Sequence, residues 1–502
     1  MYSREFKVNL NRRDFLNTMG IGAVSFCLGN VISACKNKST RPNIIFIMAD
    51  DMGYGDPGCY NPQSKTPTPN IDRLASQGIR FTNAHSPGSV CVPTRYGLLT
   101  GRYPFRVDLK KHRETSLIEP GRLTLGSLLQ KHGYKTACVG KWHLGFENLR
   151  TIDYSKPFRG GPVDRGFDYF YGIHASLDIP PYYYIENDRS IEPPTDKIDA
   201  NQSKGVTPIQ GAFWREGKIA PGFKHDEVLP LFSDKAIGFI ENQQTIEAPF
   251  FLYLALAAPH TPWLPTGKFK GQSKAGDYGD FVAQVDATIG RIMKTLDKTG
   301  LASNTLLFFT SDNGPVWYEQ DVKRYNHKST HFLKGMKADV WEGGHRMPFI
   351  ARWPGKIASN SISHENICFT DMLATFAALM GDKLPENAGE DSYNILPALV
   401  GQKYEKPIRE AIVIEDRAII QGGWKLIFGS GKGGLSGRYS KQPFDESELK
   451  GKKGELYNLK EDPSEQKNLY AERPELVRHL SELMEKYKRY GRSVGLKGAK
   501  VK

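Results

Sequence analysis

Three continuous apolar runs constrain the fold of this 502-residue chain more than any other feature. They cover residues 43–49, 250–256 and 305–310, and none shows the polar alternation of a strand with one face in water. Such runs are typical of strands buried on both faces in a parallel sheet, with helices on either side. Amphipathic helices are predicted between them, so we expect a large α/β domain.

Polar and charged residues follow each of these strands at the point where it ends. A fourth predicted strand, residues 136–140, ends in the same way. The residues at these four ends are Asp50, Asp51, Lys141, His143, His260, Asp312 and Asn313. Because open α/β sheets bind ligands beyond the carboxyl ends of their strands, we expect one common site.

The adjacent carboxylates of Asp50 and Asp51 point to a cation at this site. Two aspartates directly after a buried strand cannot both enter a core without compensation, although helix capping or solvent exposure would also satisfy them. The three carboxylates and one amide oxygen among these residues suit Ca²⁺ or Mg²⁺ and would not select zinc. A multi-oxygen anion such as sulfate or phosphate would be surrounded by cationic and imidazole side chains. These side chains are Arg95, Lys141, His143, His260 and Lys337.

Cys91 lies in a loop of small residues that leads into a predicted helix. Pro93 suits the first turn of that helix and Arg95 would lie about one turn in, so Cys91 would lie at the helix N-terminus. That position favours an anionic oxygen or a thiolate, although an isolated cysteine is more typical of a buried core residue. A disulfide between Cys59 and Cys91 is a further alternative, and it would exclude Cys91 from catalysis.

The first 35 residues are predicted to be a targeting segment. Arg12 and Arg13 form a twin-arginine pattern, and the uncharged stretch 19–34 is short for a membrane span. Small residues precede Cys35 as in a bacterial lipobox, so we expect either a lipidated Cys35 or a plain signal peptide. Both alternatives predict export, to the periplasm or to an outer-membrane-anchored lipoprotein.

Two further units are predicted, a large domain over 36–383 and a smaller one over 384–502. The smaller unit would combine an antiparallel sheet, with strands within 411–428 and 455–459, and a final helix. Residues 158–222 are predicted to be irregular and to form a pocket rim. The net charge of +13 suits an anionic substrate, and no dense basic tract indicates a nucleic-acid partner.

The Cys91-x-Pro93-x-Arg95 sequence resembles the signature of the type I, formylglycine-dependent sulfatases of the alkaline phosphatase superfamily. The resemblance covers almost the whole chain after the targeting segment. It extends through Asp50, Asp51, 98–102, 140–145, His260, 311–314, Lys337, 342–344, 456–459 and 462–463. It implies an α/β fold with a large mixed, mostly parallel sheet between helices, and a smaller C-terminal α+β subdomain.

The resemblance also implies a role for each site residue. Cys91 would be oxidised to formylglycine by a maturation enzyme, and the hydrated aldehyde would attack sulfur. One Ca²⁺ ion would be held by Asp50, Asp51, Asp312, Asn313 and the modified Cys91. Arg95 and His143 would hold the formylglycine diol. Lys141 and Lys337 would bind the sulfate, and His260 would protonate the leaving alcohol together with Lys337.

An exported bacterial carbohydrate sulfatase is therefore expected, acting on a sulfated galactose or hexosamine unit of a glycan. Candidate substrate-binding residues are His174, Ser176, Asp178, Tyr182 and Arg346. A phosphoester or phosphonate hydrolase on the same scaffold is one alternative. A non-catalytic glycan-binding surface lipoprotein is another, and membrane contact is expected only through a lipid anchor.

Overall fold

The computed structural model describes residues 41–402, 404–438 and 453–495. The predicted targeting segment with Cys35 therefore lies outside the described residues, as does most of the loop predicted between residues 429 and 454. Within the described ranges, no helix has the length and apolar character needed to cross a bilayer.

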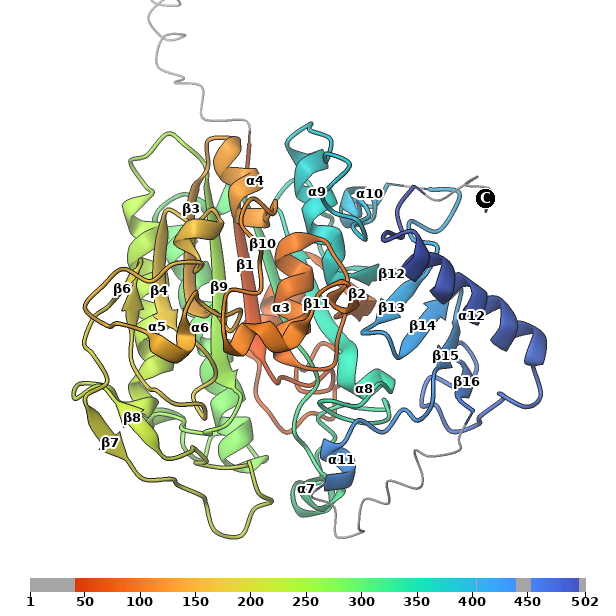
Figure 1. Cartoon of the computed structure of the whole chain (residues 1–502), viewed down its shortest axis with the longest axis horizontal. Helices are drawn as coiled ribbons and strands as arrows, with labels where there is room; N and C mark the ends of the chain where they lie inside the picture. The colour runs from red at the N-terminus through yellow and green to blue at the C-terminus, as the bar shows by residue number, and fades with distance from the viewer. Residues whose placement is uncertain (1–40, 403, 439–452, 496–502) are drawn as a thin grey trace, which may run out of the picture. The chain divides into compact units, whose positions relative to one another are not determined.

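The three apolar runs form neighbouring strands at the centre of a ten-stranded sheet (Figure 1). The central strand β1 (Asn43–Asp50) is buried along its whole length and pairs in parallel with β9 (Phe250–Pro259) and β10 (Thr305–Ser311). On its other side β9 pairs in parallel with β3 (Lys135–Lys141). These four strands place their carboxyl ends at one edge of the sheet, as the apolar runs predict.

The outer strands make the sheet mixed. On one side β11 (Arg346–Arg352) runs antiparallel to β10, followed by β2 (Ile79–His85) and the edge strand β12 (Ser361–Cys368). On the other side β3 is followed by β4 (Tyr169–Ile173), β5 (Ile185–Glu186) and β6 (Arg189–Ser190). The large mixed sheet confirms the predicted fold class.

The prediction that residues 158–222 are irregular is wrong in part. The segment contains β4, β5 and β6 of the main sheet and a separate ribbon of β7 (Asp196–Ile198) with β8 (Gly217–Ile219). These strands have two to five residues each. Elements this short depend on pairing with their neighbours rather than on local propensity, so the sequence pattern does not reveal them.

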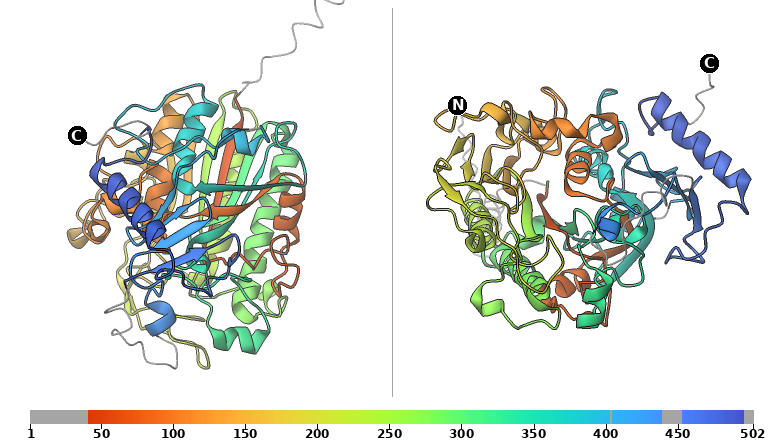
Figure 2. Two further views of the ribbon diagram at one scale, coloured as in Figure 1. Left: turned by 90° about the vertical axis from the view of Figure 1, so that its right-hand side faces the viewer. Right: turned by 60° about the horizontal axis from the view of Figure 1, so that its bottom comes forward.

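Helices cover both faces of the sheet, as the left view of Figure 2 shows. One group packs together from α2 (Pro69–Ser76), α5 (Val228–Asn242) and α6 (Gly276–Lys298). The other contains α3 (Cys91–Thr100), α4 (Leu125–Lys131) and α9 (Met372–Leu379). Shorter helices are α7 (Glu319–Tyr325), α8 (Glu342–His345), α10 (Leu396–Leu399) and α11 (Leu435–Arg438).

A second, antiparallel sheet follows with its own apolar cluster. Its strands, in spatial order, are β13 (Ile412–Ile414), β14 (Ala418–Gln421), β15 (Trp424–Ile427) and β16 (Glu455–Asn458). The last helix, α12 (Pro474–Arg489), buries Leu480, Leu483, Met484 and Tyr487 in this cluster. The predicted C-terminal sheet and helix are confirmed, whereas the boundary at residues 383 and 384 stays a prediction.

Candidate active site

The structure brings the strand-end residues together at the carboxyl edge of the central strands. Asp50 is the last residue of β1, and Asp51 turns away from the strand with a left-handed φ of 65°. Its backbone N–H donates to Oδ1 of Asp312 at 3.2 Å, just beyond β10. Asn313 donates from Nδ2 to Oδ1 of Asp51 at 2.6 Å. Side chains from two distant strands therefore share one polar cluster.

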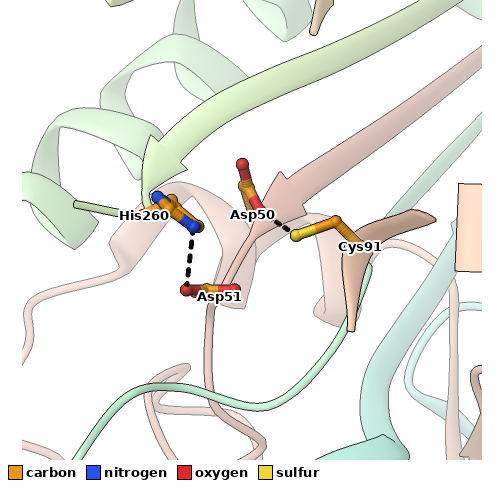
Figure 3. A group of neighbouring side chains, drawn as sticks. All are labelled: Asp50, Asp51, Cys91 and His260. Atoms are coloured by element: carbon orange, nitrogen blue, oxygen red, sulfur yellow. Dashed lines mark hydrogen bonds and ion pairs between the residues drawn. The ribbon is translucent and has the colours of Figure 1, made fainter. Parts of the chain in front are cut away.

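Cys91 enters this cluster as the first residue of α3. All ten residues of that helix are buried, and Val90 precedes it without a side-chain cap. The thiol Sγ lies 3.3 Å from Asp50 Oδ1, the contact drawn in Figure 3. Both Cys59 and Cys91 are free thiols, so the structure does not contain the disulfide considered as an alternative.

Three permanent cations pair with the three carboxylates. Lys141 Nζ, at the end of β3, donates to Asp50 Oδ2 at 2.6 Å. Lys337 Nζ lies 2.7 Å from Asp51 Oδ1 and 3.7 Å from Cys91 Sγ. Arg95 donates from Nη2 and Nε to Asp312 Oδ2 at 2.8 and 3.1 Å. Because every pair is buried, each ion would be costly to leave without its partner.

Two histidines complete the site. His260 lies after β9, with Nδ1 2.6 Å from the carbonyl oxygen of Thr261 and Nε2 3.6 Å from Asp51 Oδ2 (Figure 3). The carbonyl contact requires a proton on Nδ1, and it leaves Nε2 facing the cluster. His143 has a left-handed φ of 58°, and its buried Nδ1 has no hydrogen-bond partner in the described chain.

The electrostatic environment fixes the protonation of several groups. Burial alone would raise the pKa of Asp50, but Lys141, His260 and Arg95 hold it well below its usual value. Burial raises the pKa of the Cys91 thiol, and the charges of Asp312 and Asp50 raise it further. Cys91 is therefore a protonated thiol at neutral pH, and in this form it is a poor nucleophile. Burial, with Lys141 and Arg95, lowers the pKa of His143.

The residues present fit a hard divalent cation. Asn313 Oδ1 is buried and has no hydrogen-bond partner among the described residues, so it is available as a metal ligand. Candidate ligand atoms of Asp50, Asp51, Cys91 and His260 lie within 4.8 Å of one another. Three carboxylates and an amide oxygen are the donors that Ca²⁺ prefers.

A second buried group, His85, Glu342 and His345, also has metal-like spacing. Here Lys425 Nζ lies 3.0 Å from both Glu342 Oε1 and His345 Nε2, so the chain itself supplies the cation. Only the first group is therefore a candidate metal site.

Two candidate substrate-binding side chains already have partners inside the protein. His174 Nε2 lies 2.9 Å from the carbonyl oxygen of Pro181, and the ring stacks on Tyr183. Tyr182 donates its hydroxyl to the carbonyl oxygen of Arg215 at 2.8 Å. The backbone of His174 does adjoin the site, because His143 N–H donates to its carbonyl oxygen at 3.0 Å. Ser176 is buried in the same loop.

Asp178 keeps a free acceptor. Its Oδ2 contacts Arg215 Nη1 at 2.5 Å, while its buried Oδ1 has no partner within the described residues. Arg215 was not predicted, since it lies in the segment predicted to be irregular and no local pattern marks it. Arg346 donates from Nε to the carbonyl oxygen of Thr82 and pairs with Glu342 at 3.5 Å. It therefore lies on the β2 side of the sheet edge.

Comparison with known proteins assigns the class that this fold and site define. Residues 42–382 match the Sulfatase family, and the chain belongs to that family. It is a sulfuric ester hydrolase. It is 36% identical over 510 residues to the N-acetylgalactosamine-6-O-sulfatase of Bacteroides thetaiotaomicron, covering 93% of this chain and 97% of that protein. Human arylsulfatase A is 34% identical over 368 residues, covering 72% and 68%.

Solved structures agree with this assignment. A structure from work on glycosaminoglycan metabolism by Bacteroides thetaiotaomicron superimposes with a TM-score of 0.78 at 34% identity, covering 90% of this chain and all of that one. A sulfatase from Pseudoalteromonas sp. gives 0.69 at 25% identity, covering 90% and 91%. A phosphonate monoester hydrolase of Agrobacterium radiobacter gives 0.58 at 18% identity over 90% and 96%, a likeness of fold alone.

Proposed function

We propose that the protein removes 6-O-sulfate from N-acetylgalactosamine units of a sulfated glycan. This choice of substrate is supported by the 36% identity to an N-acetylgalactosamine-6-O-sulfatase along nearly the full length of both chains. The site supports hydrolysis of a sulfate ester, because the cations of Lys141 and Lys337 act on Cys91 while each also pairs with a carboxylate. This substrate is a particular case of the sulfated hexosamine expected from the sequence.

Residue 91 is proposed to act as formylglycine, which supplies a geminal diol oxygen as nucleophile. The unmodified thiol is an unsuitable nucleophile here, because burial and neighbouring carboxylates keep it protonated. Arg95, which also donates from Nη1 to the carbonyl oxygen of Lys141, would help to orient the modified side chain together with His143. Lys337 Nζ lies 3.7 Å from Sγ and so places an ammonium group beside the reacting atom.

A single Ca²⁺ is the proposed metal, and it would polarise the sulfate oxygens when bound. Asp50, Asp51, Asp312 and Asn313 would hold it, and the unpartnered Oδ1 of Asn313 supports this choice. Lys141 and Lys337 would bind sulfate oxygens. His260 presents Nε2 to the cluster, and as an imidazolium it would transfer the Nε2 proton to the leaving alcohol oxygen and become neutral.

Export is part of the proposal, with anchoring through a lipidated Cys35 as the form we favour over a plain signal peptide. A host maturation enzyme that oxidises Cys91 is the required partner. Radiolabelled palmitate should be incorporated into the wild-type protein in its native host and not into Cys35→Ala.

The decisive experiment combines mass spectrometry of the Cys91 peptide with a matched substrate panel. Protein from the native host should carry an aldehyde at residue 91. It should prefer N-acetylgalactosamine 6-sulfate to the 4-sulfate, to N-acetylglucosamine 6-sulfate and to N-acetylgalactosamine 6-phosphate. Preference for the phosphate would favour the phosphoester hydrolase alternative. An active enzyme with an unmodified thiol would contradict the formylglycine mechanism, and glycan binding without turnover would favour the surface lipoprotein.

A further inference from the structure

The C-terminal sheet contributes a residue that holds the loop before Cys91. Glu415 begins the turn between β13 and β14 and has a left-handed φ of 55°. A non-glycine residue in this region is strained and persists only where its surroundings require it. The backbone N–H of Glu415 donates to the carbonyl oxygen of Pro87 at 2.8 Å. Glu415 Oε1 accepts hydrogen bonds from N–H and Oγ of Ser89 at 3.1 and 3.0 Å.

We propose that Glu415 is a positioning residue that sets the distance between the reactive atom of residue 91 and the ammonium group of Lys337. The inference rests on the proposed role of residue 91. It adds a function for the C-terminal sheet, which supplies no residue to the polar cluster described above.

Ser89 connects the two loops whose spacing matters. Its N–H and hydroxyl bind Glu415, while its carbonyl oxygen accepts a hydrogen bond from Ala338 N–H at 2.8 Å. Ala338 directly follows Lys337 and has a left-handed φ of 70°. Glu415, Ser89 and Ala338 thus form a continuous chain of hydrogen bonds from the C-terminal sheet to the Lys337 loop.

The same C-terminal unit supports the Lys337 loop from a second side. Val340 N–H donates to the carbonyl oxygen of Gly431 at 2.8 Å, and Gly433 N–H donates to Asp339 Oδ1 at 2.6 Å. Arg417, in the turn that Glu415 begins, donates to the carbonyl oxygen of Ser430 at 2.9 Å. The turn at Glu415 therefore holds the loop 87–90, and the segment 430–433, which is bonded to the same turn, holds the Lys337 loop.

The position of Cys91 depends on this support, because Val90 caps α3 without a side-chain hydrogen bond. If the bonds from Ser89 to the Glu415 side chain are removed, the loop keeps its bonds to Thr94 Oγ1 and to the backbone of Glu415 and Ala338. It is then held less firmly, and Cys91 can shift relative to Lys337 Nζ, now 3.7 Å from Sγ. A displacement of about 1 Å between reacting groups can cost about 100-fold in rate.

The test compares Glu415→Ala with Glu415→Gln and with the control Glu410→Ala. Glu410 belongs to the same unit and accepts a hydrogen bond from Tyr487, and within the described residues it makes no hydrogen bond or ion pair with either loop. At equal aldehyde content, Glu415→Ala should lower kcat about 10- to 100-fold with KM changed less than about threefold. Glu415→Gln should keep most activity, because an amide oxygen can accept both bonds from Ser89. Glu410→Ala should keep the wild-type kcat.

A second measurement does not need catalysis. In protein made without the maturation enzyme, Cys91 is 5% exposed, and its alkylation by iodoacetamide should accelerate in Glu415→Ala but not in Glu410→Ala. Unchanged kcat and unchanged alkylation in Glu415→Ala would overturn the proposal. So would equal losses in Glu415→Gln or in Glu410→Ala. A wild-type enzyme inactive on every sulfate ester would instead refute the proposed function, while the alkylation rates would still report on Glu415.

Discussion

Lys141 Nζ lies 2.6 Å from Asp50 Oδ2, and neither side chain has any exposed surface. Burial by itself would raise the pKa of Asp50 and lower that of Lys141. Their contact reverses both effects, so the pKa of Asp50 lies well below its usual value and that of Lys141 above it. Both groups are therefore charged across the neutral range. Lys141 would be an ammonium cation when a sulfate binds.

Lys141→Met should abolish measurable turnover and also destabilise the protein. Removing one partner of a buried pair leaves an uncompensated charge and costs about 3–5 kcal/mol. The free energy of unfolding in urea measures this loss. The double variant Asp50→Asn with Lys141→Met should regain stability without activity. Equal stability of Lys141→Met and wild type would show that the ion pair is not needed for folding.

Calcium should stabilise the chelator-treated protein through the carboxylates and Asn313. A ligand present at about 100 times its Kd adds about 2.7 kcal/mol, which appears as a rise in Tm. Asn313→Leu removes the unpartnered amide oxygen and should shift the Tm response to higher Ca²⁺ concentration. Asn366→Ala, on the edge strand β12, should respond as wild type does. Absence of any Ca²⁺-dependent rise in the wild type would argue against the metal site.

Asp178→Ala should separate sugar recognition from sulfate chemistry. The free Oδ1 of Asp178 can accept a sugar hydroxyl, which an aryl sulfate lacks. We expect about a tenfold higher KM for N-acetylgalactosamine 6-sulfate, with kcat/KM for an aryl sulfate within about twofold of wild type. Steady-state kinetics on both substrates decide this. Equal losses on both would mean that Asp178 supports the loop rather than the sugar.

Acid should destabilise the protein through the buried His85. Burial lowers its pKa to about 4, although Glu342 opposes this effect. The unfolded chain binds a proton below about pH 6.5, whereas the folded protein does so only near pH 4, so stability falls as pH decreases through that window by up to about 3 kcal/mol. His85→Gln should show a shallower decline in urea unfolding between pH 7 and 4.5. His479→Gln, exposed on α12, should decline as wild type does.

The central strands and the site around them could be predicted because the residues that determine them lie next to one another in the sequence. A strand buried on both faces must be apolar throughout, and the charged residue after it marks its end, as with Asp50 after β1. The antiparallel C-terminal strands and α12 also carry clear local patterns. The edge strand β12 is partly or fully exposed over 361–366 and contains Glu365, so its sequence resembles a loop, and its pairing with β2 makes it a strand.

The supporting residues of the site could not be predicted for a different reason. Glu415 and Arg215 act through partners 326 and 37 residues away in the chain. Nothing in their neighbouring sequence distinguishes them from solvated charges. The left-handed backbone at Asp51, His143 and Ala338 is likewise imposed by tertiary contacts, since glycine is the residue expected there.

The complete burial of α3 has a consequence for the protein as a population of molecules. Once the chain has folded, Cys91 is 5% exposed and a second enzyme has almost no access to it. Under the proposed modification, Cys91 of each molecule must therefore be oxidised before folding buries it, and a molecule that has folded unmodified stays unmodified. Molecules that are not oxidised would fold into stable but inactive protein. The specific activity of a preparation would therefore depend on the capacity of the maturation system during synthesis, and not on later conditions in the cell.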